Sequence, residues 1–266
     1  MNNIRNNHFS EISLLITHYN RSQSLGRLLK KVEELEISFN EIIVSDDNSK
    51  PEHQNKLNEF VGRFGITLIK TPLNKGLANN LNKGQKAVKS PFTLYIQEDF
   101  VPTEKFLQAL KDGFDLLKED PSTDLVRFYA YRKYPFLKPI RSGFSEMTFR
   151  FWYPNAYQFN CYSDHPHLRR SNFLEKFGNY KEGIKSDKSE FRMVISFLQN
   201  KGKALIINDI KGILIQMNDV TEPSQVKRKK LRSIIQRSET FSLVALRFIY
   251  QNIKFRLQYF FQINEQ

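Results

Sequence analysis

Apolar segments of strand length alternate with segments of helical periodicity over the first 118 residues, and this alternation constrains the fold more than any other feature. Each apolar segment is rich in β-branched or aromatic residues and is followed by a helical segment. Strands joined by helices pair in parallel through right-handed crossovers, so the sequence predicts an α/β fold with a mainly parallel sheet flanked by helices. The expected strands are 12–17, 41–45, 66–69 and 92–96, and the expected helices begin at Ser22, Pro51, Leu77 and Thr103, with Ser22 and Thr103 as N-caps.

Polar residues cluster where three of these strands end, at 17–21, 46–49 and 97–99. In an open α/β sheet the carboxyl ends of parallel strands share one edge, and ligands bind in the crevice beyond it. Glu98 and Asp99 directly follow an apolar strand there, where they are placed to hold a hard divalent cation that clamps a diphosphate. The alternative for this stretch alone is a strand that ends in a solvated acidic turn.

The composition is that of a globular protein with an excess of positive charge. Of the 266 residues, 40% are hydrophobic and 26% are charged, and the formal net charge of +13 favours anionic partners such as nucleotides, acidic lipid surfaces or nucleic acid. A single cysteine, Cys161, excludes an intramolecular disulfide and is typical of a reducing compartment. The first nine residues are too polar for a secretory signal, and no apolar run is long enough to span a bilayer, so we expect a cytoplasmic protein.

The second half carries fewer signals. We expect strands at 125–131, 203–207 and 212–216 and a helix that begins near Lys185. The aromatic segment 149–154 is suited either to stacking on sugar rings or to the core, and the sequence leaves both open. For His165 and His167, which would share one face of a strand, hydrogen-bonded histidines are favoured over a metal site, because no third ligand is evident.

The final segment is basic and helical by pattern. From Lys227 onward there are nine Lys and Arg and two Glu, a net charge of +7. Two faces are expected: a polar one of Arg247, Gln251, Lys254 and Gln258, and an apolar one of Leu246, Ile249, Ile253, Leu257 and Phe260. Such a helix is suited to the inner surface of a membrane, or to packing on the domain or on a second subunit. We therefore divide the chain into 1–120, 121–223 and a basic helical extension, 224–266.

The motifs of the first 110 residues, taken together, resemble a known family. They are Thr17-His-Tyr-Asn-Arg21, Asp46-Asp47 after the second strand, Asn74-Lys-Gly76 with Asn82-Lys-Gly84, and Tyr95-Ile-Gln-Glu-Asp99. In this order they resemble the inverting glycosyltransferases of the GT-A fold, a Rossmann-like fold of nucleotide-diphospho-sugar transferases. Within these the chain is similar to glycosyltransferase family 2, which builds bacterial surface polysaccharides.

The resemblance implies a role for several residues. Thr17, Tyr19 and Arg21 would line the nucleotide, and Asp47 would accept a hydrogen bond from the base, uracil being favoured. Asp99 would be the direct ligand of a divalent cation, Mn²⁺ or Mg²⁺, with Glu98 beside it.

Two positions depart from the family's pattern. Gln97 stands where the first Asp of the usual Asp-x-Asp motif is expected, and a neutral amide would weaken the hold on a metal. Leu81 stands where Arg often precedes the Asn of the third motif, so Lys75 or Lys83 would supply positive charge to the diphosphate. A solvated surface position is as plausible for either lysine.

The family also places a carboxylate at the start of a later helix, where it acts as general base on the acceptor hydroxyl. This chain lacks the usual Glu-Asp pair there. Glu190 matches the position best, and Asp187 is the alternative one helical turn earlier. The competing explanation is that acids favour the N-terminal end of a helix dipole.

The sequence therefore implies a metal-dependent inverting glycosyltransferase of hexosyltransferase type. It would use a nucleotide-diphosphate sugar, with a UDP-sugar favoured, and a saccharide or lipid-linked acceptor in capsule or O-antigen biosynthesis. A homo-oligomer and peripheral membrane contact stay open. A nucleotidyltransferase and a non-catalytic sugar-nucleotide-binding protein are the alternatives. A nucleic-acid-binding module is disfavoured, because it needs no acidic clusters at strand ends.

Overall fold

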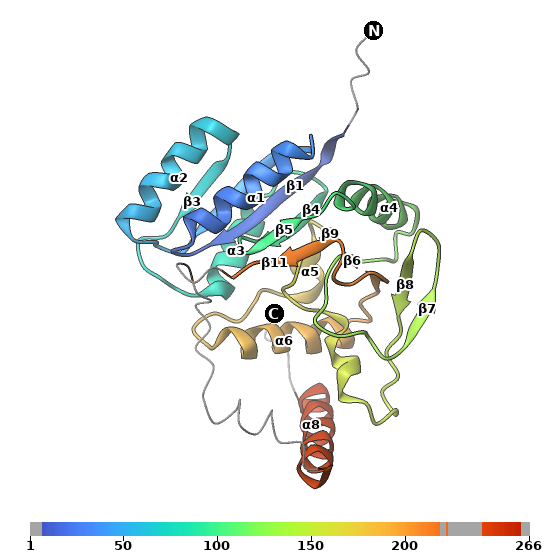
Figure 1. Ribbon diagram of the computed structural model, residues 1–266. Helices are drawn as coiled ribbons and strands as arrows, with labels where there is room; N and C mark the ends of the chain where they lie inside the picture. The colour runs from blue at the N-terminus through green and yellow to red at the C-terminus, as the bar shows by residue number, and fades with distance from the viewer. Residues whose placement is uncertain (1–6, 219–221, 223–240, 262–266) are drawn as a thin grey trace.

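A computed structural model of the chain describes residues 7–218, Glu222 and residues 241–261. Nine strands form one sheet in the order β3-β2-β1-β4-β9-β6-β10-β8-β7, and β11 pairs with β5 in a two-stranded sheet (Figure 1). The strands of the large sheet are β1 (His8–His18), β2 (Ser38–Asp46), β3 (Thr67–Lys70), β4 (Phe92–Gln97), β6 (Leu125–Arg127), β7 (Leu137–Pro139), β8 (Phe144–Met147), β9 (His167–Arg170) and β10 (Ala204–Ile207), and the small sheet holds β5 (Phe100–Pro102) and β11 (Leu214–Gln216).

The four strands expected from the first half, β3-β2-β1-β4, pair in parallel as predicted. Beyond β4 the sheet is mixed, because β9 inserts antiparallel between β4 and β6. Since β9 is antiparallel to both neighbours, β6 runs in the same direction as β4. The carboxyl ends of β1, β2, β4 and β6 therefore lie along one edge of the sheet, together with the amino end of β9.

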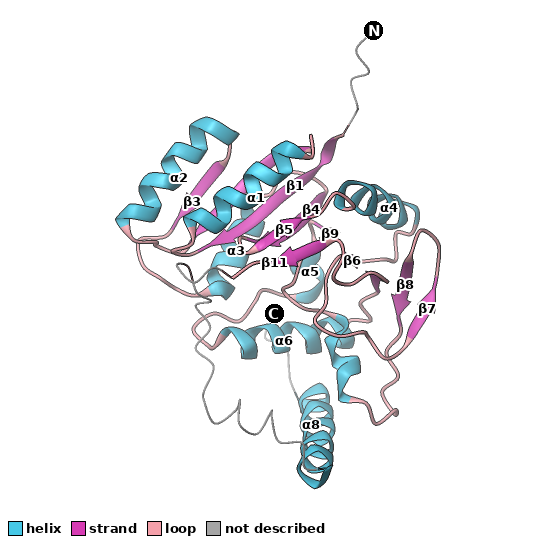
Figure 2. Ribbon diagram, in the orientation of Figure 1, coloured by secondary structure: helices cyan, strands magenta, loops and turns pink. Residues whose placement is uncertain are grey.

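Helices cover both faces of the sheet (Figure 2). Side chains alternate along β1, so that Leu14 and Ile16 pack with α1, α2 and α4, whereas Leu15 packs on the opposite side with α3, α5 and α6. This three-layer arrangement confirms the expected α/β fold. The helices are α1 (Ser22–Glu34), α2 (Pro51–Phe64), α3 (Leu77–Ala87), α4 (Phe106–Glu119), α5 (Phe173–Phe177), α6 (Ser186–Gln199) and α8 (Phe241–Phe261), with a 3₁₀ segment, η1 (Ala156–Cys161).

Three local expectations were wrong in detail. Helix α1 includes Ser22 and is preceded by Arg21, and its free N–H groups are bound by a carboxylate from far along the chain, Glu222. Helix α4 begins at Phe106, because the Thr103 hydroxyl donates to the carbonyl oxygens of Gly212 and Ile213 and joins the chain to β11. The strand expected over 125–131 ends at Arg127, beyond which the chain turns along the carboxyl edge.

The C-terminal helix packs beside η1 and α6 and forms an outer layer, seen at the bottom of Figure 1. It begins at Phe241, so residues 224–240 of the expected helix lie outside the part of the chain that the structure describes. Within the described residues, no helix combines the length and the apolar character needed to cross a bilayer.

Candidate functional site

An acidic pair lies at the carboxyl end of β4, where the sequence predicted it. Asp99 is buried and Glu98 is partly buried. Arg21, from the loop after β1, places Nη1 3.4 Å from Glu98 Oε1 and 3.2 Å from Asp99 Oδ2. The structure thus brings together three of the predicted site residues from two neighbouring parallel strands.

The electrostatics of the pair favour an additional cation. Burial, together with the negative charge of Asp99, raises the pKa of Glu98 to about 8, although the Arg21 guanidinium opposes this shift. If both carboxyls ionise beside a single guanidinium, an excess of negative charge results in a poorly solvated place, which is why the pKa of Glu98 is raised. A divalent cation would relieve that excess.

A segment more than a hundred residues later closes over the acidic pair. Gln216 Nε2 donates to Asp99 Oδ2 at 2.9 Å, and Arg21 Nη2 donates to Asn218 Oδ1 at 3.1 Å. The Met217 N–H also donates to the Asp99 carbonyl oxygen at 2.7 Å. No local pattern in the sequence assigns a role to these residues, since their partners lie more than a hundred positions away.

The residues present fit a cation that is held jointly with a diphosphate. Glu98 and Asp99 supply carboxylate oxygens, which Mg²⁺ and Mn²⁺ prefer. No cluster of three or more His, Cys, Asp or Glu suited to a metal occurs among the described residues, so further ligands would come from phosphate and water. In each of His165 and His167 one ring nitrogen is already hydrogen-bonded, since His165 Nδ1 contacts the Ser163 hydroxyl and His167 Nδ1 contacts the His165 carbonyl oxygen.

Asp47 lies at the end of β2 and holds the loop that enters α3. Its two carboxylate oxygens accept from the backbone N–H groups of Lys75, at 2.8 Å, and Gly76, at 2.7 Å. Gly76 has a φ of 86°, a conformation that favours glycine. Asp47 is therefore fixed at the N-terminus of α3, on the edge of the sheet where a nucleotide is expected, with its charge balanced by backbone dipoles.

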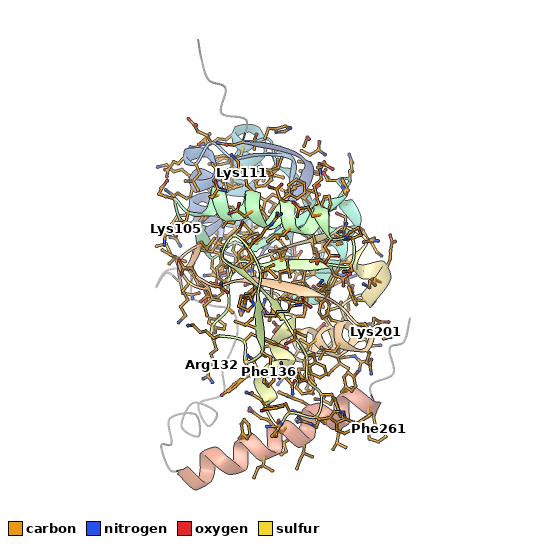
Figure 3. All side chains as sticks on the ribbon, turned by 90° about the vertical axis from the view of Figure 1, so that its right-hand side faces the viewer. Lys105, Lys111, Arg132, Phe136, Lys201 and Phe261 are labelled. Carbon is orange, nitrogen blue, oxygen red and sulfur yellow. The ribbon has the colours of Figure 1, made fainter. Side chains whose placement is uncertain are left out.

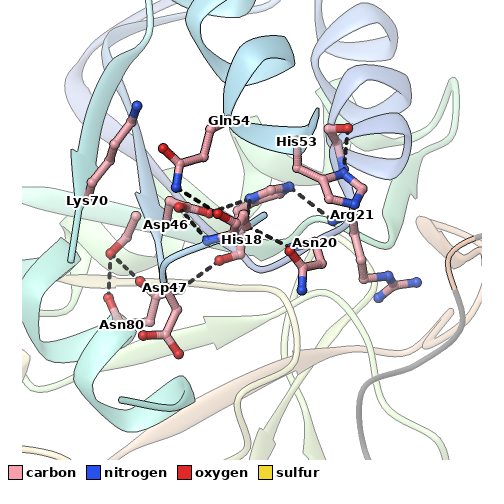
Figure 4. Close-up of polar contacts among 12 residues, drawn as sticks. His18, Asn20, Arg21, Asp46, Asp47, His53, Gln54, Lys70 and Asn80 are labelled. Atoms are coloured by element: carbon pink, nitrogen blue, oxygen red, sulfur yellow. Dashed lines mark hydrogen bonds and ion pairs between the residues drawn. The ribbon is translucent and has the colours of Figure 1, made fainter. Parts of the chain in front are cut away.

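Asp46 belongs to a buried network that fixes the loop after β1 (Figure 4). Its Oδ1 lies 2.8 Å from His18 Nδ1 and accepts from the Ser49 hydroxyl. His18 Nε2 accepts from the Arg21 N–H at 3.2 Å, so the imidazole is occupied on both sides. Burial alone would raise the pKa of Asp46, but the hydrogen bonds from His18 and Ser49 outweigh it and lower that pKa. The Ser-His-Asp composition is thus structural, and it orients Arg21.

The other residues predicted to bind the nucleotide differ in their burial and contacts. The Thr17 hydroxyl is buried and lies 3.0 Å from the Tyr95 hydroxyl, within the sheet. Lys83 Nζ donates to the Asp46 carbonyl oxygen at 2.5 Å, and burial lowers its pKa. Lys75 is exposed at the loop, and Tyr19 is half-buried beside Arg21. Of the two lysines, Lys75 is the exposed one.

The predicted base, Glu190, lies on the first turns of α6 and contacts the segment before β9. Glu190 Oε1 accepts from the Asp164 N–H at 3.0 Å. Burial raises the pKa of Glu190, and burial together with the charge of Glu190 raises that of the neighbouring Asp164. Asp187 is exposed one turn earlier. A carboxyl with a raised pKa is a stronger base once ionised, which favours Glu190 over Asp187 for proton removal.

Tyr131, which the sequence analysis did not single out as a site residue, contacts a neighbour of Asp99 on one side and a neighbour of Asp164 on the other. Its hydroxyl donates to Gln216 Oε1 at 2.8 Å, and Gln216 in turn contacts Asp99. Its ring meets the ring of His165 edge-on at 4.6 Å, next in sequence to Asp164. The side chain of Tyr131 is 49% exposed. An exposed aromatic ring is thus held at the carboxyl edge, beyond the end of β6.

Comparison with known proteins agrees with this geometry. A profile described as "Glycosyl transferase family 2" matches residues 13–180. An uncharacterized glycosyltransferase of Haemophilus influenzae is 30% identical over 106 residues, which cover 38% of this chain and 35% of that protein. A dolichol-phosphate mannosyltransferase of Pyrococcus furiosus is 26% identical over 111 residues, 40% of this chain and 32% of that protein. The chain matches only about a third of the length of these curated relatives.

Solved structures show the same fold over nearly the whole chain. Residues 1–349 of S. aureus TarS, in complex with UDP-GlcNAc, superpose with a TM-score of 0.62 at 14% identity, covering 95% of this chain and 73% of that one. The mannosyltransferase PcManGT of Pyrobaculum calidifontis, in complex with GDP-Man and Mn²⁺, has a TM-score of 0.57 at 11% identity, covering 94% and 74%. With the profile spanning more than half of its residues, from β1 to the approach to α6, the chain belongs to glycosyl transferase family 2.

Proposed function

We propose that the protein transfers a hexose from a nucleotide-diphosphate sugar to a saccharide or lipid-linked acceptor, with inversion at the anomeric carbon, in the synthesis of a surface polysaccharide. The observation that carries this proposal is the acidic pair Glu98–Asp99 at the carboxyl edge, joined to Arg21 and closed by Gln216. A poly-β-1,6-N-acetyl-D-glucosamine synthase of Staphylococcus epidermidis, 30% identical over 90 residues, supports the polysaccharide role.

The donor would lie across the ends of β1, β2 and β4. Asp47 and Tyr19 would contact the nucleoside, and Arg21 and Lys75 would face the diphosphate. Thr17 and Lys83 would support the site from below, because their polar atoms already bind Tyr95 and the Asp46 carbonyl oxygen. UDP-sugars are favoured by the resemblance in the Asp46-Asp47 motif, and the TarS complexes with UDP-GlcNAc and UDP are consistent with that choice.

A divalent cation, Mn²⁺ or Mg²⁺, would be held by Asp99 with Glu98 beside it. When bound, it would neutralise charge on the departing nucleoside diphosphate. The ion in the PcManGT complex supports this part of the proposal. Arg21 would then release part of its contact with the pair and turn toward the phosphates, since a guanidinium and a dication compete for the same oxygens.

Inversion requires a base on the side of the sugar opposite the leaving group. Glu190 would accept the proton of the acceptor hydroxyl, and the resulting alkoxide-like oxygen would displace the nucleoside diphosphate at the anomeric carbon in one step. The exposed ring of Tyr131 would support the acceptor. Its hydroxyl contacts Gln216, which binds Asp99, and its ring contacts His165, which is next in sequence to Asp164.

The same proposal covers the organisation of the chain. Residues 1–120 would bind the donor and 121–223 the acceptor, within one domain, and 224–266 would make the peripheral membrane contact. Such contact would place the protein on the cytoplasmic face of a membrane, close to a lipid-linked acceptor.

A donor screen tests the central claim. The purified chain is heated with UDP-, GDP- and other nucleotide sugars, each with and without Mn²⁺, and nucleotide release is then followed with the donors that bind. We expect one class of donor to raise the melting temperature, and more so with Mn²⁺.

Binding without release under any acceptor mixture would favour the non-catalytic alternative. Release of pyrophosphate from a nucleoside triphosphate and a sugar phosphate would indicate a nucleotidyltransferase. No stabilisation by any nucleotide sugar would contradict the proposal.

A further inference from the structure

The C-terminal helix α8 packs on the domain through a face that is neither the polar nor the apolar one expected from the sequence. The ring centroid of Phe255 lies 5.4 Å from that of Phe159 in η1 and 4.5 Å from that of Phe191 in α6. Tyr259 packs on Phe149, in the segment before η1. Arg256 Nη2 donates to the Phe151 carbonyl oxygen at 3.0 Å, and Gln199 Nε2 donates to that of Tyr259 at 2.6 Å. The helix is therefore held firmly to the domain.

This packing leaves the apolar side of α8 directed outward. Ile253 is 55% exposed, Leu257 is 51% and Phe260 is 63%, and these residues follow the spacing of one helix face. Among the side chains of α8 that the structure describes, from Phe248 onward, the other large apolar ones that are exposed are Phe248, Ile249, Tyr250 and Phe261. Figure 3 shows α8 as an outer layer of the molecule, with Phe261 at its end. We call Ile249, Ile253, Leu257, Phe260 and Phe261 the outer face of α8.

The outer face continues onto a loop of the domain. Phe151 packs edge-on against Phe260, with ring centroids 5.1 Å apart, and against the adjacent Trp152 at 4.9 Å. Trp152 is 87% exposed, and it is the single tryptophan of the chain. An exposed patch of this length on a globular protein is typical of an interaction surface.

The charge of this part of the sequence selects among the partners that could cover the patch. Lys254 is exposed on α8 and Lys201 is exposed just after α6, and in the sequence the residues from Lys227 onward, α8 included, carry a net charge of +7. A second copy of the chain would bring another +13 toward this surface, and the repulsion would oppose self-association. An anionic lipid surface suits both the charge and the apolar character of this region, because it attracts basic residues and accepts apolar side chains below its headgroups.

We propose that the outer face of α8, continued by Trp152, inserts into an anionic membrane leaflet, with the helix lying in the plane of the interface. Tryptophan is suited to the headgroup level, where its ring is half in the apolar region. The proposal names the surface that would make the peripheral contact included in the proposed function, but it does not depend on sugar transfer, since vesicle binding is measured without donor or acceptor.

The single tryptophan provides a direct readout. The full-length protein is mixed with vesicles of phosphatidylcholine alone, or of phosphatidylcholine with phosphatidylglycerol, and bound protein is separated by flotation. We expect binding to the anionic vesicles, a blue shift of the Trp152 emission on binding, and quenching by lipids brominated near the headgroup. Raised salt should weaken the binding, because the basic residues contribute through long-range attraction.

Substitutions separate the apolar face from the basic segment. The double variant Ile253→Ser/Leu257→Ser removes two apolar side chains from the outer face and leaves every charge in place. We expect at least about a tenfold loss of vesicle partition, from the lost apolar burial. The matched control is Val61→Ser/Ile140→Ser, two exposed apolar residues on α2 and beyond β7, which should bind as the wild type does. Equal melting temperatures would show that all variants fold.

Three results would overturn the proposal. One is wild-type protein that ignores anionic vesicles. Another is a double variant that binds as well as the wild type, which would assign attachment to the basic segment alone. The third is a wild-type dimer that Ile253→Ser/Leu257→Ser converts to a monomer, measured by light scattering, without any blue shift on vesicles, which would make the outer face an interface between copies. None of these results bears on donor binding, so failure here is distinguishable from failure of the proposed function.

Discussion

The guanidinium of Arg21 lies 3.2 Å from Asp99 Oδ2, and this ion pair joins the loop after β1 to the loop after β4. Both side chains are almost fully buried. In the proposed function, a divalent cation would replace part of this guanidinium contact at the two carboxylates when a diphosphate binds.

Asp99→Asn should remove metal-dependent turnover while the fold is kept, because the amide retains the shape and the contact with Gln216 but not the charge that holds a cation. We expect kcat with Mn²⁺ to fall by more than about a hundredfold. Circular dichroism and the melting temperature check the fold. The matched control is Asp115→Asn, an exposed position on α4. Wild-type activity of Asp99→Asn with Mn²⁺ would show that the assigned metal site is wrong.

Asp47→Ala should raise the donor KM by about tenfold or more, with a smaller effect on turnover of bound donor, since recognition of the base is uniform binding. The same change removes the acceptor for Lys75 and Gly76 N–H groups and should cost about 1–2 kcal/mol of stability. Asp47→Asn separates the two effects, because its amide oxygen still accepts one backbone N–H. A donor KM that is unchanged in both variants would rule out a contact with the donor.

Glu190→Gln should lower the rate of sugar transfer by roughly 10²- to 10⁴-fold, the usual contribution of a general base, and leave donor affinity unchanged. Gln keeps an oxygen that can accept from the Asp164 N–H, so the segment before β9 stays in place. Asp187→Asn is the matched control on the same helix. If the loss appears in Asp187→Asn and not in Glu190→Gln, the base is Asp187.

The pH dependence of transfer should report the raised pKa of Glu190. Burial favours the protonated carboxyl, so the acidic limb of kcat/KM should lie above the pH range in which an ordinary glutamate titrates. The free energy of unfolding changes with pH in the opposite direction to activity. Because the folded state holds the Glu190 proton more tightly than the unfolded state, the stability due to Glu190 is present at low pH and is lost as pH rises through the folded pKa. Glu190→Gln should therefore be at least as stable as the wild type at neutral pH. An acidic limb at the ordinary carboxyl pKa would contradict the assignment.

Tyr131→Ala should raise the acceptor KM by about tenfold with the donor KM unchanged, because the ring is proposed to support the acceptor and not the nucleotide. Tyr131→Phe keeps the ring and removes only the hydrogen bond to Gln216, so its acceptor KM should stay near that of the wild type. The measurement uses a saccharide array incubated with UDP and Mn²⁺ as well as kinetics with any acceptor it identifies. Equal acceptor affinity of Tyr131→Ala and wild type would exclude stacking on this ring.

The sequence alone determined the part of the fold that depends on local pattern. The alternation of apolar and helical segments fixes β1 to β4 and their helices, and the direction of parallel strands then places Arg21, Asp47 and Asp99 at one edge. These features follow from side-chain periodicity and from the order of elements, both of which are visible within short windows of sequence.

The tertiary structure decided everything that depends on partners far apart in the chain. The insertion of β9 between β4 and β6, the contact of Gln216 with Asp99, and the capping of α1 by Glu222 carry no local signal. The same holds for α8, whose composition showed an apolar side but not which side would face the domain. Each depends on the relative free energies of alternative packings across the whole core. In α8 the packing of Phe255 and Tyr259 on the domain leaves Ile253, Leu257 and Phe260 outside.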